Sequence, residues 1–136
     1  MGDKESADAL MSASTVTGDT VRNMKGEDLG RIEEVMIDLG SGRIAYAVLA
    51  SDGFLGMGGR FLAVPWNALA VDIEQREFIL DVEKERLERA PAFDEDNWPS
   101  MTDRQWAETV HGFYGSRPYW EAAKSRTEAF HIHPQP

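Results

Sequence analysis

Two strands joined by a tight turn are encoded in the stretch RIEEVMIDLGSGRIAYAVLA, residues 31–50. Apolar residues recur at every second position from Val35 to Leu39 and again from Ile44 to Val48. A period of two is typical of strands that bury one face, so we expect these residues in the core. Between the runs, Gly-Ser-Gly favours a tight turn, because glycine adopts positive φ without strain. The stretch therefore predicts an antiparallel hairpin.

Ile32 is out of phase with this alternation. A β-bulge near Glu33 and Glu34 would return Ile32 to the buried face, and bulges are common where a small barrel bends. In the second strand the larger apolar residues alternate with alanines, and we expect that strand to lie at the centre of the sheet.

Short apolar stretches punctuated by glycine continue over residues 15–82, a spacing that favours an all-β barrel or sandwich. Pro65 cannot donate a ladder hydrogen bond, and it therefore indicates a strand end or a sheet edge. A polar stretch, residues 74–77, separates two alternating apolar runs and predicts a second hairpin with one buried face. The further strands expected are 20–22, 61–64, 69–73 and 78–82.

Composition and apolar periodicity divide the chain into three parts. Residues 1–14 are rich in Ser, Ala, Asp and Lys without apolar periodicity, and we interpret them as a disordered leader. Residues 15–82 are interpreted as the barrel domain, and residues 83–136 as a helical, aromatic-rich C-terminal extension. A capping sequence and apolar residues at helical spacing predict one amphipathic helix near 103–114, followed by a loose tail.

Composition excludes several classes of function. The 136 residues include no cysteine, which excludes disulfides, thiolate metal sites and cysteine nucleophiles. The formal net charge of -10 disfavours nucleic acids and anionic lipids as partners. No apolar run approaches the ~20 residues of a membrane-spanning helix, and the acidic start does not resemble a signal peptide. We therefore expect a cytoplasmic protein.

Each candidate for chemistry has a simpler structural interpretation. The glycine-rich loop 51–59 runs between strands and lacks the Lys and Ser or Thr of a phosphate loop, which favours a mobile contact loop. Residues 94–97, Asp-Glu-Asp-Asn, lack the following glycine and glutamate of a calcium loop. His111 has no nucleophile with an orienting group beside it, and His131 and His133 have no third ligand in view. We expect no enzyme, no cofactor and no metal.

Aromatic residues gather in the segment after Pro91. The segment is acidic, which argues against stacking on nucleic-acid bases. Two interpretations remain open: the extension folds back over its own barrel, or it exposes an aromatic patch to a partner or a second subunit. The residues concerned are Phe93, Trp98, Trp106, Phe113, Tyr114, Tyr119 and Trp120.

Four segments together resemble the PRC-barrel family: GRIEEVMID at 30–38, GRIAYAVL at 42–49, GFLGMG at 53–58 and VPW at 64–66. That family includes the cytoplasmic domain of the photosynthetic reaction centre H subunit and the C-terminal domain of a ribosome maturation factor. The extension is similar to that of stand-alone bacterial members. The resemblance implies a mainly β fold, a small six-stranded barrel used as an adaptor, with no shared catalytic residues.

We therefore expect a non-enzymatic adaptor that assembles with itself, as a homodimer, or with a protein partner. Edge strands pair readily with other chains, and apolar residues on a glycine loop are costly to leave exposed. The alternative is a module that handles a small ligand, an ion or protons in electron transfer, like the H subunit; the carboxylates at 33–34 and 94–96 motivate it. The residues expected to contact the partner are Phe54, Leu55, Met57, Trp98 and Trp120.

Overall fold

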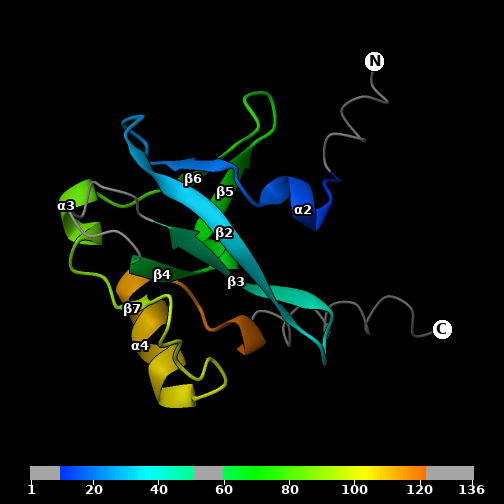
Figure 1. Ribbon diagram of the computed structural model, residues 1–136, viewed down its shortest axis with the longest axis vertical. Coiled ribbons are helices and arrows are strands. Elements are labelled where there is room, and N and C mark those ends of the chain that lie inside the picture. Colours follow the sequence, from blue (N-terminus) through cyan, green and yellow to red (C-terminus); the bar gives the residue numbers. More distant parts are fainter. Residues whose placement is uncertain (1–9, 51–59, 122–136) are drawn as a thin grey trace.

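The computed structural model describes residues 10–50 and 60–121, and its strands form one sheet (Figure 1). Helices are short except for one near the C-terminal end. The elements are α2 (Ala13–Val16), β1 (Thr20–Arg22), β2 (Asp28–Asp38), β3 (Arg43–Ala50), β4 (Arg60–Pro65), η1 (Trp66–Ala68), β5 (Leu69–Asp72), β6 (Glu77–Leu80), α3 (Lys84–Leu87), β7 (Ala92–Asp94) and α4 (Arg104–Tyr114).

The mainly β fold is confirmed, but the sheet differs from the six-stranded barrel that the resemblance implies. Seven strands lie in the order β5-β6-β1-β2-β3-β4-β7, and the sheet is not closed, because β5 and β7 are its two ends. All neighbours pair antiparallel except β1 and β6, which are parallel. The seventh strand, β7, comes from the extension and pairs with β4. It is too short for a period of two to be recognised in the sequence.

The predicted hairpin of residues 31–50 is formed by β2 and β3, and the predicted bulge is confirmed. Ile32 pairs with Leu49 and Glu34 with Val48, so the register shifts between Ile32 and Glu34. The extra residue returns Ile32 to the core, where it is only 1% exposed. The central position of β3 is confirmed as well, between β2 and β4.

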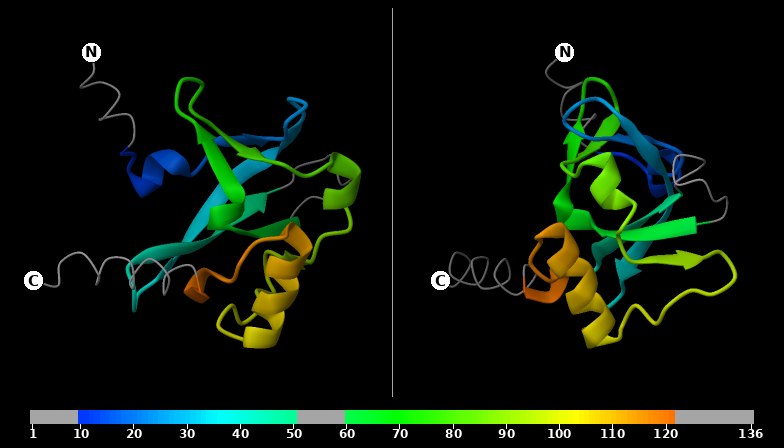
Figure 2. Two further views of the ribbon diagram at one scale, coloured as in Figure 1. Left: turned by 180° about the vertical axis from the view of Figure 1, so that it is seen from behind. Right: turned by 90° about the vertical axis from the view of Figure 1, so that its left-hand side faces the viewer.

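The expectation that the whole apolar run of β2 is buried is wrong at its far end. Ile37 is 50% exposed and Leu39 is 91% exposed. The outer part of the hairpin, residues 35–44, projects beyond the rest of the sheet, and we call it the β2–β3 arm (Figures 1 and 2). Because the arm extends past the rest of the sheet, its apolar residues keep the alternating pattern although no other described element fully covers them.

Both faces of β3 are buried, each against a different layer. Ala47 and Leu49 belong to a core cluster inside the curved sheet, which also contains Leu29 and Leu62. Tyr46, Val48 and Ala50 lie on the other face of β3, which packs against the C-terminal extension. Met11 packs against the inner core, so packed structure begins within residues 1–14, before the boundary drawn from the sequence.

The extension folds back over the sheet, which decides between the two interpretations of its aromatic residues. The helix predicted near 103–114 is α4; Asp103 caps it by accepting a hydrogen bond from the backbone N–H of Gln105. Gly115 ends it at φ 65°, a left-handed conformation that favours glycine. Figure 2 shows α4 packed beside β3 and β4 as a second layer.

Within residues 10–50 and 60–121, no helix is long and apolar enough to cross a membrane.

Candidate interaction surface

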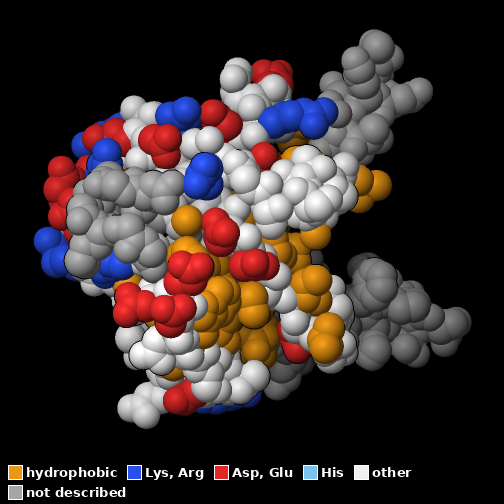
Figure 3. Space-filling model, viewed as in Figure 1, with side chains coloured by type: hydrophobic (Ala, Val, Ile, Leu, Met, Phe, Trp, Pro, Cys, Tyr) orange, Lys and Arg blue, Asp and Glu red, His pale blue; other side chains and the backbone are white. Residues whose placement is uncertain are grey.

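An apolar groove of about 360 Å³ opens between the N-terminal segment, the β2–β3 arm and the edge strand β5. Figure 3 shows hydrophobic side chains gathered in the hollow between α2 and the end of the arm. We call it the edge groove. It is lined by Leu10, Met11, Ala13, Val16, Val35, Ile37, Ile44, Trp66, Val71, Ile73 and Phe78.

The groove exists because the sheet is open. Among the described strands, β5 is hydrogen-bonded only to β6, so its outer edge lacks a strand partner. Val71 and Ile73, at 47% and 40% exposure, stand on this side, and the arm stands opposite them. The face of the second hairpin that we expected to be buried is therefore only partly buried. A strand that closed the barrel would cover these residues.

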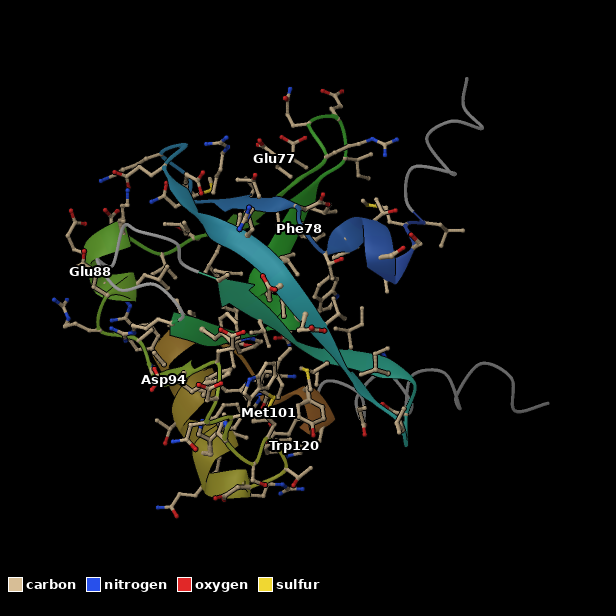
Figure 4. The ribbon with its side chains drawn as sticks, viewed as in Figure 1. Glu77, Phe78, Glu88, Asp94, Met101 and Trp120 are labelled. Atoms are coloured by element: carbon tan, nitrogen blue, oxygen red, sulfur yellow. The ribbon has the colours of Figure 1, made fainter. Side chains whose placement is uncertain are left out.

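The floor of the groove is well packed. The Trp66 and Phe78 rings lie 5.6 Å apart between centroids, and Phe78 is only 4% exposed. In Figure 4, Phe78 lies beside α2, while Met101 and Trp120 lie near α4, on the other side of the β2–β3 hairpin. The groove is thus separated from the face that the extension covers. Its rim is exposed and its floor is closely packed.

The tip of the arm is held in place by its own hydrogen bonds. The Asp38 carboxylate accepts from the backbone N–H of Gly40 at 3.3 Å and from the Ser41 hydroxyl at 2.8 Å. The Gly42 N–H donates to the Asp38 carbonyl at 2.7 Å, and Gly42 has φ 77°. These bonds form the predicted glycine turn and present Leu39 to solvent in a fixed position.

A second cluster of interest lies under the extension, around Tyr46. Its ring centroid lies 5.5 Å from Trp106, 5.4 Å from His111 and 5.6 Å from Tyr119. His111 is 1% exposed, and burial lowers its pKa, an effect that the Arg117 backbone partly offsets. Burial raises the pKa of Tyr46. The cluster joins the extension to β3 and is therefore a structural interface.

The structure places only two of the five residues expected to contact a partner. Trp98 packs edge-on against Phe61 and at a tilt against Phe93, and is 39% exposed. Trp120 contacts Tyr119, and the Arg104 guanidinium lies 4.1 Å from its ring centroid. Both tryptophans contribute to docking the extension. Phe54, Leu55 and Met57 lie outside the described residues.

The carboxylates that motivate ion handling do not converge. Within the described part of the chain, no three His, Asp or Glu side chains are placed to hold a metal ion. Residues 33–34 lie on β2, in the middle of the sheet, and residues 94–96 begin at the end of β7, which is an edge strand separated from β2 by β3 and β4. His131 and His133 lie outside the described residues.

Sequence reasoning missed the residues that form the edge groove. Ile37, Val71 and Ile73 have the alternating pattern of buried strand residues, and nothing in that pattern separates a covered face from an open one.

Comparison with known proteins identifies the family of this chain. A family model described as the PRC-barrel domain matches residues 8–87, more than half of the chain. A solved structure of a 16S ribosomal RNA processing protein, RimM, from Pseudomonas aeruginosa is similar at 14% identity and a TM-score of 0.41. The match covers 55% of this chain and 45% of that one, and no curated protein sequence matches. By the match to its family model, the chain belongs to the PRC-barrel domain family.

Proposed function

We propose that this protein is a non-enzymatic adaptor that binds an apolar segment of another polypeptide in the edge groove. The observation that carries the proposal is the position of the groove. It combines exposed apolar side chains with the edge of β5 that pairs with no other described strand, so a bound segment can gain both apolar burial and backbone hydrogen bonds. Fully burying one leucine-sized side chain is worth roughly 1.5–3 kcal/mol, and several such side chains line the rim.

The lining of the groove supports binding in preference to catalysis. None of its side chains carries an acid, a base or a nucleophile, and Trp66 contributes the only polar side-chain group. Reactions of the common enzyme classes need such groups within hydrogen-bond reach of the reacting atoms. An apolar groove of this kind stabilises a complex through contact area, which is what an adaptor requires.

Changing Ile37 to Asp is expected to abolish partner binding without unfolding the protein. Ile37 is half exposed, so the charge remains solvated in the free protein but loses water when a partner covers it. The measurement is affinity capture from a lysate of the source cells with Ile37→Asp and wild-type baits, followed by mass spectrometry. Met24→Asp is the matched control, because Met24 is a 72% exposed residue between β1 and β2, outside the groove. Partners retained equally by all three baits would contradict the proposal.

A second candidate, binding of a small apolar molecule, is favoured by the volume of the groove. Small-molecule pockets commonly measure about 300–1,000 Å³. A ligand present at about 100 times its Kd raises the free energy of unfolding by about 2.7 kcal/mol. Thermal-shift measurements with long-chain fatty acids and quinones test this candidate, and a stabilisation that Ile37→Asp removes would favour it over the adaptor.

A further inference from the structure

The edge groove lies beside an apolar knob on the same chain. Leu39, in the turn at the tip of the β2–β3 arm, is 91% exposed, and Ile37 of β2 lines the groove two residues away. Leu10, at 83% exposure, stands at the opposite rim. The edge groove, which could receive an apolar side chain, therefore lies close to Leu39, an apolar side chain that nothing in the described part of the chain covers.

The knob is built to stay exposed. The side-chain and backbone bonds of Asp38 fix the turn that carries Leu39, so the side chain cannot fold back into its own groove without breaking them. Because these bonds already order the backbone of the turn, little backbone conformational freedom is lost when Leu39 binds. These bonds raise the affinity for whatever receives Leu39.

A second copy of this chain can place its Leu39 in the edge groove of the first copy and receive the first copy's Leu39 in its own groove. When a twofold axis passes between two adjacent complementary features, each feature of one copy meets its complement on the other, and the assembly closes as a dimer. We infer that the protein forms a homodimer in which Leu39 of each copy enters the edge groove of the other, with the two arms antiparallel. This inference rests on the proposed function, because it names the occupant of the same groove.

Charge is consistent with this occupant. The chain carries a formal net charge of -10, so two copies repel each other, yet the residues that line the groove are uncharged. The contact itself is apolar, but Asp38 precedes Leu39 and Asp72 lies between Val71 and Ile73, so carboxylates of the two copies come close to each other at its border. The affinity of the dimer therefore increases with salt, which screens the repulsion, whereas binding of a basic partner would weaken.

Sedimentation equilibrium of the full chain tests the dimer. We expect wild type to associate more tightly at 0.5 M than at 0.05 M NaCl, by the screening argument. Leu39→Asp is expected to raise the dimer Kd by about 100-fold or more, because the change occurs twice in a symmetric interface. Met24→Asp, the exposed control, should leave the Kd unchanged. A wild-type monomer in both salts, or a Leu39→Asp protein that dimerises normally, would overturn the inference.

Cross-linking tests where the copies meet. Because the chain has no cysteine, Leu39→Cys protein can be mixed with Ile73→Cys protein that carries a different tag, and then oxidised. We expect a disulfide between the two differently tagged chains, in greater yield than with Met24→Cys protein in place of Leu39→Cys. A dimer without this cross-link assembles through another surface, and that result rejects the inference.

These outcomes are separate from those that test the proposed function. A wild-type monomer that captures a foreign protein through the groove, and loses it with Ile37→Asp, would overturn the homodimer while leaving the adaptor intact. A dimer with the expected cross-link, and no other partner, would support the homodimer and identify the second copy as the segment bound.

Discussion

Replacing Tyr46 by alanine is expected to lower the free energy of unfolding by ~3–5 kcal/mol, the range for large aromatic side chains removed from a core. Tyr46 is 1% exposed and contacts Trp106, His111 and Tyr119 at once, so its loss leaves a cavity between β3 and the extension. Urea unfolding followed by circular dichroism measures the loss. Hydrogen exchange should show α4 opening more readily than the strands, because Tyr46 joins the two layers.

The matched control is Tyr46→Phe. The Tyr46 hydroxyl is buried and has no hydrogen-bond partner among the described residues, so its removal deletes a desolvated polar group and keeps the ring contacts. We expect a change smaller than about 1 kcal/mol, in either direction. If Tyr46→Ala unfolds at the same urea concentration as Tyr46→Phe, the extension does not depend on this cluster.

Stability is expected to fall as the pH is lowered from 7 to 5, with His111 as a principal cause. Burial holds the pKa of His111 below its ordinary value of 6.5 in the folded protein, while the unfolded chain titrates near that ordinary value. Above pH 6.5 both states are neutral there, and the full stability is present. Below it the unfolded chain binds the proton first, so stability decreases by up to about 1.4 kcal/mol per pH unit until the folded pKa is reached.

His111→Leu tests this cause directly. The variant cannot bind the proton, so its free energy of unfolding, measured in urea at pH 5, 6 and 7, should change less with pH than that of wild type. The rings around the imidazole are those of Tyr46, Tyr119 and Trp120, and burial raises the pKa of Tyr46 further above this range. Parallel pH profiles for variant and wild type would show that other groups carry the dependence.

Asp19 contributes to the pH dependence of stability with the opposite sign. Burial raises the pKa of its carboxyl above 3.8, and Arg76 partly reverses the effect. The folded protein therefore holds that proton more tightly than the unfolded chain, and stability declines as the pH rises through the pKa values. Asp19→Asn removes this contribution, so comparing this variant with wild type over the same pH range separates the Asp19 effect from the His111 effect.

Much of the sheet could be predicted from local patterns. The hairpin of residues 31–50, the bulge near Glu33 and the helix of residues 104–114 each depend on neighbours in sequence: alternation, glycine turns and capping. Such signals are short-range, so a single sequence contains them. The strand β7 could not be predicted, because three residues show no period and its pairing with β4 crosses about thirty positions of chain.

The sequence by itself determined the mainly β fold, the central place of β3 and the family that the chain resembles. All three depend on short-range patterns: apolar alternation, glycine turns and short motifs. Only the tertiary structure decided which apolar faces are covered. Tyr46 and Ile37 belong to equivalent alternating runs, yet Tyr46 is buried by the extension and Ile37 lines an open groove. Burial depends on which distant segment packs against a strand, and among the described residues the sheet ends at β5, where the N-terminal segment covers the face only in part.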